Sequence, residues 1–381
     1  MEFELSPTQE AARAAVEQLI AGPSATTFSP PSWRTTWAAL VDSGLVELIA
    51  PESEPSSETD TASTEADSVV TGIETCEILR GLGLRAVHVP LLGAVALAPV
   101  LARDSVDAVR EHWLPRLRSG SALVTPAVGE AAGGAPDETG TRAFPDGSGW
   151  RLTGSLLAVP FADEVDRLVL WAATPDQAIG VFLVDPQADG VVAHPTVSTT
   201  GEREYAVALN GVRVEPLDVV AAPGVSGERA ARRLYQHLLV GLAAEQLGLA
   251  ETALEMTARY VSSRKQFGQP IGAFQAVSTR AADAYIDLTA MRWTMYRAAE
   301  TVYAGTDAGA EVAVAKFWAA DGGARILAAA VHLHGGLGVD TTYPLHRYFL
   351  RGKRVEVMLG GTGTQLARLW DALAGREAVH D

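Results

Sequence analysis

The chain has 381 residues, of which 48% are hydrophobic, and a formal net charge of -16. This length allows two or three domains with sizeable cores, and the negative charge argues against nucleic acid or an anionic membrane surface as a partner. The single cysteine excludes a disulfide framework and a cysteine metal site. No uninterrupted apolar run reaches the roughly 18 residues of a membrane span, and the first residues lack the basic and apolar regions of a signal peptide. We therefore expect a cytoplasmic protein without membrane contacts or a metal site.

The first 120 residues have the spacing of helices. Apolar residues recur three and four apart over 7–19, 33–44, 69–82 and 90–101. Residues 51–68 are instead rich in Ser, Thr, Glu and Asp, which predicts a surface loop with too little apolar surface to order itself. We therefore expect a helical N-terminal domain over residues 1–120.

The pattern changes over residues 121–225. Short apolar runs are separated there by Gly, Pro, Asp and Asn, as in the runs 150–152, 167–171, 180–184, 206–209 and 212–214. This is strand-and-turn spacing, and it predicts a small β-barrel or sandwich.

Helical spacing returns over residues 226–381. We expect helices at roughly 229–263, 273–304, 308–333 and 362–375, joined by loops into a four-helix bundle. The predicted fold class is therefore α+β, with three domains at 1–120, 121–225 and 226–381.

The most informative stretch lies between the first two of these C-terminal helices. It reads Arg264-Lys-Gln266-Phe267-Gly-Gln-Pro-Ile-Gly-Ala-Phe-Gln275. Its glycines and proline end one helix, so Arg264 and Phe267 should lie on a turn, where an arginine can grip a phosphate and a phenylalanine can cover an aromatic ring. The structural alternative is a capped helix hairpin with one buried Phe.

This stretch resembles the signature of the acyl-CoA dehydrogenase family. A second segment, His334-Gly-Gly-Leu-Gly338 followed by Tyr343-Pro-Leu-His-Arg347 and Gly360-Gly-Thr362, resembles the family in the same order and spacing. The resemblance implies a helical N-terminal domain, a middle β domain and a C-terminal four-helix bundle. It also implies FAD, an acyl-CoA substrate, an electron-transferring flavoprotein as acceptor, and a dimer of dimers.

The family reaction needs a carboxylate base, and the two usual positions lack one here. The position before the C-terminal Gly-Thr holds Gly360, and the position about seven helical turns before Arg264 falls near Leu238. His237, Glu245 and Glu356 are weak alternatives. The resemblance therefore implies no catalytic residue at either usual position.

The positions that complete a neighbouring subunit's FAD are better kept. By resemblance, the cofactor-binding residues are Arg264, Gln266, Phe267, His332, Gly335, Gly336 and Thr362. The flavin-side segment departs from the family, because 125–132 reads Thr-Pro-Ala-Val-Gly-Glu-Ala-Ala and the ring-packing positions hold Ala158 and Pro160. Ala158 has no ring to stack, and Pro160 has no N–H to donate.

The lack of a carboxylate at both base positions and the altered flavin-side segment make this chain similar to the glutamate-less subunits of actinobacterial heterotetrameric sterol side-chain acyl-CoA dehydrogenases. The resemblance implies an α2β2 complex in which a homologous glutamate-bearing subunit supplies the base and shares the FAD, and in which a steroid side-chain CoA ester is desaturated. Two alternatives stay open: a self-sufficient dehydrogenase with a relocated base, and a flavin-free acyl-CoA-binding protein or lyase on the same fold.

Overall fold

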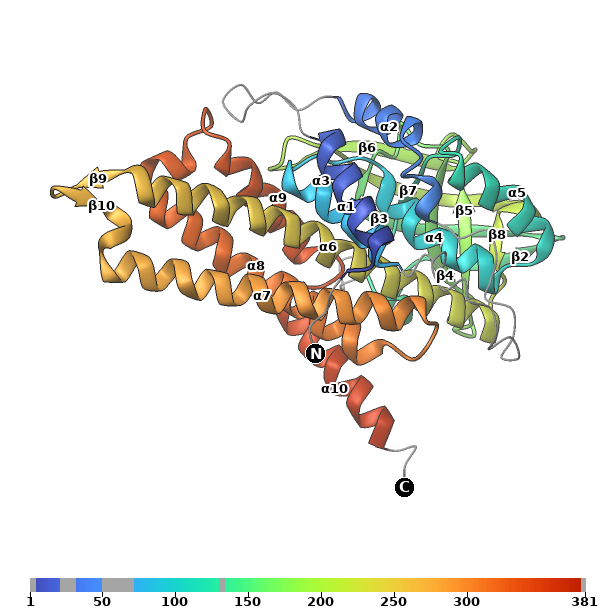
Figure 1. The fold of residues 1–381 in the computed structure, drawn as a ribbon. Helices are drawn as coiled ribbons and strands as arrows, with labels where there is room; N and C mark the ends of the chain where they lie inside the picture. The colour runs from blue at the N-terminus through green and yellow to red at the C-terminus, as the bar shows by residue number, and fades with distance from the viewer. Residues whose placement is uncertain (1–4, 21–31, 50–71, 130–133, 378–381) are drawn as a thin grey trace. The chain divides into compact units, whose positions relative to one another are not determined.

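The computed structural model describes residues 5–20, 32–49, 72–129 and 134–377 (Figure 1). The chain forms two compact units, one of residues 1–15, 37–75 and 89–238 and one of residues 16–36, 76–88 and 239–381. The polar segment 51–68 lies outside the described residues. The division into three domains stays a prediction.

The first unit contains the predicted β domain as one hydrogen-bonded sheet. Its strands follow the order β6-β7-β3-β2-β4-β5-β8, and β1 pairs with β4 in parallel. The core of the sheet is β4, whose residues from Leu168 to Ala173 are all buried. The strand bounds are β1 Val124–Pro126, β2 Arg142–Asp146, β3 Gly149–Pro160, β4 Arg167–Ala173, β5 Ile179–Val184, β6 Val191–Val197, β7 Arg203–Val214 and β8 Val219–Ala221.

The predicted runs 206–209 and 212–214 are one strand, β7, rather than two. Leu152 of β3 faces Val212 and the next residue, Thr153, faces Asn210, so Gly211 is an extra residue in the ladder. Its φ of +69° is the left-handed conformation that glycine adopts at such a bulge. The Asn-Gly pair therefore bends the strand instead of ending it.

The helices of the first unit are fixed to one another by buried charge. The Asp104 carboxylate at the end of α4 accepts hydrogen bonds from Arg229 at 2.7 Å and Arg233 at 2.6 Å, both on α6. Helices α4 (Leu91–Asp104) and α5 (Asp107–Arg118) lie wholly in this unit, and α5 was not predicted. Helices α1 (Pro7–Ile20), α2 (Trp33–Asp42), α3 (Ile73–Leu84) and α6 (Val225–Ser263) run from one unit into the other.

The second unit is built around α8, which packs against α7, α9 and α10. Figure 1 shows α7 and α8 side by side. The bounds are α7 Gln275–Tyr303, α8 Gly309–His334, α9 Leu345–Val357 and α10 Thr362–Glu377. The four predicted helices are present as α6, α7, α8 and α10, whereas α9 is an additional helix. No helix in the described ranges has the length and apolar character needed to span a membrane.

Helices α3 and α6 touch backbone to backbone in the second unit. A Cβ added at Gly248 of α6 would collide with the carbonyl oxygen of Arg80, and one added at Gly83 of α3 would collide with that of Glu245. Two glycines thus allow the helix backbones to approach more closely than any side chain would permit.

We expect Gly248→Ala to lower the free energy of unfolding by about 2–3 kcal/mol, because an added methyl group has no room there. Chemical denaturation of the variant measures the loss. The matched control is Gly363→Ala on α10, where an added Cβ meets nothing within 4 Å. It should be neutral or slightly stabilising, and equal effects at both sites would contradict the close packing.

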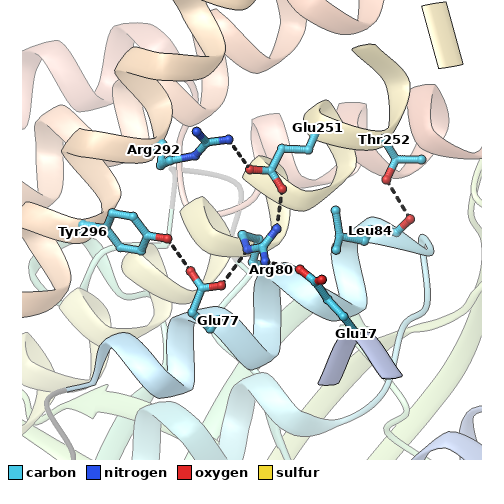
Figure 2. A network of polar contacts seen from close by, with 8 residues as sticks. All are labelled: Glu17, Glu77, Arg80, Leu84, Glu251, Thr252, Arg292 and Tyr296. Carbon is cyan, nitrogen blue, oxygen red and sulfur yellow. Dashed lines mark hydrogen bonds and ion pairs between the residues drawn. The ribbon is translucent and has the colours of Figure 1, made fainter. Parts of the chain in front are cut away.

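A buried ion network also holds the second unit together (Figure 2). Arg80 of α3, whose side chain is 7% exposed, donates to Glu77 at 2.8 Å, to Glu251 of α6 at 2.5 Å and to Glu17 of α1 at 2.6 Å. Burial disfavours the charged guanidinium, but Glu251 and Glu77 outweigh it and raise the pKa of Arg80 above its ordinary value. Arg80 is therefore a permanent cation at the centre of three carboxylates.

The network continues onto α7 through two of these carboxylates. Arg292 donates to Glu251 at 2.8 Å, and the Tyr296 hydroxyl donates to the fully buried Glu77 at 2.5 Å. Both oxygens of Glu77 and of Glu251 are thereby engaged. The network around Arg80 therefore connects α1, α3, α6 and α7 (Figure 2).

Candidate functional site

A short hairpin after α6 carries the first predicted cofactor residues. Strand β9 (Lys265–Gln266) pairs antiparallel with β10 (Gln269–Pro270), and the residues between them, Phe267 and Gly268, have φ angles of +53° and +84°. Two positive φ angles are typical of a type I′ hairpin turn. A bulky aromatic residue is rare in that conformation, and Phe267 is 93% exposed. The alternative of a buried Phe is therefore wrong, and strain at an exposed ring suggests a functional role.

Arg264 and Gln266 lie at the base of the same hairpin. The backbone carbonyl of Arg264 accepts from the Ile271 amide at 2.8 Å, which closes the hairpin. The side chains of Arg264 and Gln266 are exposed, and the guanidinium of Arg264 has no partner within the described ranges. The Arg264 donors are therefore available to an anion.

The predicted glycine pair forms a turn at the end of α8. Gly335 has φ +61° and ψ -137°, a conformation that a side chain would strain. A Cβ added at Gly336 would meet nothing within 4 Å. The turn thus presents bare, open backbone, which allows a ligand group to approach closely.

His332 lies in a groove of about 740 Å³ on the second unit. The groove runs along α7 and α8, with Ile286 and alanines among its lining and with charged residues of both signs. Arg325 is neutralised there by a two-pronged pair with Asp287 at 2.8 Å. The lining residues are Arg280, Asp283, Ala284, Ile286, Asp287, Arg325, Ala328, Ala329 and His332. A groove of this size can accept part of a ligand that also reaches His332.

The loop at the first base position is held by a buried lysine. The Lys316 ammonium of α8 donates to the carbonyls of Val355 at 3.1 Å, Glu356 at 3.0 Å and Gly360 at 3.3 Å. Gln365 adds a hydrogen bond to the Gly360 carbonyl at 3.2 Å. Burial lowers the pKa of Lys316 to about 7, but the Val355 and Glu356 carbonyls lie at the C-terminus of α9, which favours a cation. Lys316 therefore fixes the backbone between α9 and α10.

We expect Lys316→Met to lower the free energy of unfolding by about 2–3 kcal/mol, because buried carbonyls lose their donors. Amide exchange over residues 358–361 should accelerate as well. Lys353→Met, at a lysine that is 45% exposed, is the control and should change stability by less than about 0.5 kcal/mol. Unchanged exchange in the loop of the Lys316 variant would contradict this role.

The second base position is apolar. Leu238 on α6 is fully buried, and its neighbour His237 is 2% exposed, with Nδ1 2.8 Å from the Arg233 carbonyl. Burial lowers the pKa of His237 to about 3, so the ring is neutral at physiological pH and binds a proton weakly. This environment favours a structural role for His237 over that of a base.

The same burial predicts a loss of stability in acid. Because the pKa of His237 falls from 6.5 to about 3 on folding, the unfolded chain binds more protons between these values, and stability decreases as the pH falls. We expect this group to cost about 2 kcal/mol between pH 6.5 and pH 5. His237→Gln should remove that part of the slope, whereas His194→Gln, at an exposed histidine, should not. Identical pH profiles for His237→Gln and the unmodified chain would contradict the assignment.

The two remaining carboxylates are both engaged. Buried Glu245 accepts from Arg351 at 2.6 Å, and Glu356 accepts from Lys353 at 2.5 Å. Each of these carboxylates is therefore paired with a cation of its own chain. Their role as alternative bases stays a prediction, as does the role of Thr362, which begins α10.

The flavin-side segment lies in the first unit. The hydroxyl of Thr125 is buried and has no hydrogen-bond partner within the described ranges. The predicted ring-packing positions lie at an irregularity in β3, where Ala158 has φ +53° and Pro160 faces Glu204 of β7. Ala158 offers no aromatic ring and Pro160 offers no N–H group, so this segment does not fit a flavin ring as well as the hairpin and turn fit a pyrophosphate. Residues 130–132 of the segment lie outside the described residues.

Several residues at these sites were not anticipated from the sequence. Lys316 gave no signal, since a lysine in a helical pattern normally faces solvent. The contacts of His334 with Tyr260 and Tyr343 also depend on the fold. Arg280, which lines the groove beside His332, also gave no signal, since an arginine on a helix normally faces solvent.

Known proteins share both the sequence and the fold. Residues 226–373 match the sequence family described as acyl-CoA dehydrogenase, C-terminal domain. Acyl-CoA dehydrogenase FadE27 of Mycobacterium tuberculosis is 37% identical over 352 residues, which cover 90% of this chain and 88% of that protein. FadE28 of the same organism is 33% identical over 342 residues, or 88% and 91% of the two chains.

Solved structures agree over nearly the whole length. The Tcur3481-Tcur3483 steroid ACAD G363A variant superposes with a TM-score of 0.83 at 31% identity, covering 97% of this chain and 98% of that one. The ChsE4-ChsE5 complex from Mycobacterium tuberculosis gives a TM-score of 0.82 at 32% identity, with coverage of 98% and 99%. The predicted α+β architecture, with N-terminal helices, a middle sheet and C-terminal helices, is confirmed.

Proposed function

This chain belongs to the acyl-CoA dehydrogenase family, and on that premise we propose that it is the glutamate-less subunit of a heterotetrameric α2β2 dehydrogenase. The observation that carries the proposal is the condition of the two base positions. One is a glycine in a left-handed conformation, Gly360 with φ +92°, and the other is the buried Leu238. By contrast, the hairpin with Arg264 and Phe267 and the Gly335–Gly336 turn are present, and both suit the phosphate end of a cofactor.

The proposed complex divides the work between its subunits. The partner supplies the carboxylate that removes the α proton of the acyl thioester. When bound, the flavin supplies the two-electron oxidation that makes the α,β double bond. This chain contributes binding and orientation.

The hairpin and the turn fit the phosphate and adenine end of FAD. Arg264 presents its free donors to the pyrophosphate, and the exposed ring of Phe267 covers an aromatic surface. The open backbone of Gly335 and Gly336 allows close approach. Gln266 and His332 border the same end of the site, and Thr362 stands at the start of α10.

The proposed substrate of the complex is a CoA ester of a steroid side chain. Support comes from one similar solved structure, a steroid ACAD, and from the ChsE4-ChsE5 structure, which is a complex of two different chains. An electron-transferring flavoprotein is the proposed acceptor. These assignments extend the family membership and require the following test.

The visible spectrum and native mass of this chain, alone and co-expressed with a glutamate-bearing homologue, test the proposal. We expect a colourless single chain and a yellow mixed tetramer with about two flavins per four chains. Phe267→Ala in the mixed tetramer should reduce the flavin content without lowering the melting temperature of the flavin-stripped complex, because the exposed ring does not support this chain's own fold. A yellow, active homotetramer with one flavin per chain would overturn the proposal and favour a relocated base.

A further inference from the structure

The last residue of α8, His334, is buried under the glycine turn. It is 3% exposed, and its ring stacks on Tyr260 of α6 with the ring centroids 4.4 Å apart and the planes at 18°. A Cβ added at Gly338 would lie 3.2 Å from the Cβ of His334. Residues 335–338 therefore wrap directly around this histidine.

The hydrogen bonds of His334 determine its protonation state. Nδ1 lies 2.8 Å from the Ala330 carbonyl, which can only accept, so Nδ1 carries a hydrogen. Nε2 lies 3.2 Å from the Tyr343 hydroxyl. Burial lowers the pKa of His334 and raises that of Tyr343, so the neutral ring accepts at Nε2 and the phenol donates.

Tyr343 closes the segment that the turn begins. Its backbone amide donates to the Asp340 carbonyl at 3.1 Å, and Asp340 also accepts from the amide of Thr342 at 2.8 Å. The chain from Gly335 to Tyr343 is thus a loop with both ends on His334, one end by covalent connection and the other by the hydrogen bond from the phenol.

We propose that His334 is a positioning residue, which together with Tyr260 and Tyr343 holds the Gly335–Gly336 turn in the shape that receives the phosphate end of the flavin. The inference rests on the proposed function and assigns to it three residues that act through the backbone of the turn. A glycine pair alone is conformationally free, whereas this turn is tied to the buried His334 and the two half-buried tyrosines that contact it.

The test uses the mixed tetramer and two variants that keep a ring in place. Tyr343→Phe removes only the hydroxyl, and His334→Phe keeps the stack on Tyr260 but loses both hydrogen bonds. We expect each to weaken FAD affinity about tenfold, as measured by titration of the flavin-stripped complex. The double variant should be little worse than either single one, because the residues act as a pair. Tyr285→Phe, the same change at an exposed tyrosine of α7, is the control.

Further readouts separate positioning from general stability and from the proposed function. In the flavin-stripped complex, Tyr343→Phe should leave the native mass unchanged and the melting temperature nearly so, while amide exchange over residues 335–338 accelerates. A wild-type complex that holds flavin, with variants that bind it equally well, would overturn this inference alone. A wild-type complex without flavin would overturn the proposed function and the inference together. A variant that loses assembly and flavin in parallel would show a merely structural role and would also overturn the inference.

Discussion

The Arg80→Met variant should lose about 3–5 kcal/mol of unfolding free energy, the largest effect on stability that we expect from a single substitution. Methionine fills similar space but leaves Glu77, which is fully buried, and Glu251 without their central cation. An uncompensated buried charge costs far more than the ion pair contributed. Denaturant unfolding followed by circular dichroism measures the loss.

Two comparisons test whether the loss comes from uncompensated charge. Adding Glu77→Gln to Arg80→Met should recover part of the stability, because it removes one orphaned carboxylate. Arg297→Met, at an arginine that is 64% exposed and paired with Glu300, should cost less than about 1 kcal/mol. An equal cost at both arginines would show that Arg80 acts only through ordinary surface pairing.

Restoring a glutamate at the first base position should not restore a dehydrogenase. In Gly360→Glu, the new Cβ would lie 2.6 Å from Cγ2 and 2.8 Å from Cβ of Thr364. The backbone there has φ +92°, which side chains rarely adopt. We expect no turnover from the chain alone and a loss of about 2–4 kcal/mol from strain and overpacking. Acyl-CoA oxidation with an artificial acceptor and thermal unfolding measure the two effects.

The neighbouring glycine provides the matched control. A Cβ at Gly361 would meet only the Glu356 carbonyl, at 3.7 Å, so Gly361→Glu should fold with little loss. Turnover by Gly360→Glu with unchanged stability would show that only a side chain is missing. An inactive and destabilised Gly360→Glu variant, which we expect, would instead mean that the backbone at Gly360 has a conformation suited to glycine. Lys316 and Gln365 hold it in that conformation.

The elements that follow from local pattern were predictable. Long apolar periodicity located α6, α7, α8 and α10, and the break at Gly268 located the turn after α6, although not its two short strands. Helix α5 was not singled out, since its Pro115 interrupts the pattern, and α9 was read as a motif rather than as a helix. The Asn-Gly pair in β7 carries a turn signal but forms a bulge, because the partner strand β3 continues past it.

The parts of the site that depend on distant contacts were not predictable. Lys316 meets carbonyls about forty positions later in the chain, and the Arg80 network joins residues from 17 to 296. A buried charge is improbable from composition alone, so only the fold identifies its partners. Arg264 and Phe267 were predicted from a local break in a helix and the glycine pair from the family resemblance, and their roles as cofactor-binding residues stay predictions.

The exposed Phe267 has a consequence for how variants of this chain are judged. A ring that contacts so little of its own protein can be removed without loss of folding, so a screen that scores cellular abundance or protease resistance will record Phe267 as freely replaceable. A growth selection that depends on the assembled enzyme would, under the proposed function, record the opposite. Disagreement between the two screens at this position would indicate that Phe267 contributes to the function of a partner chain and not to the stability of its own chain.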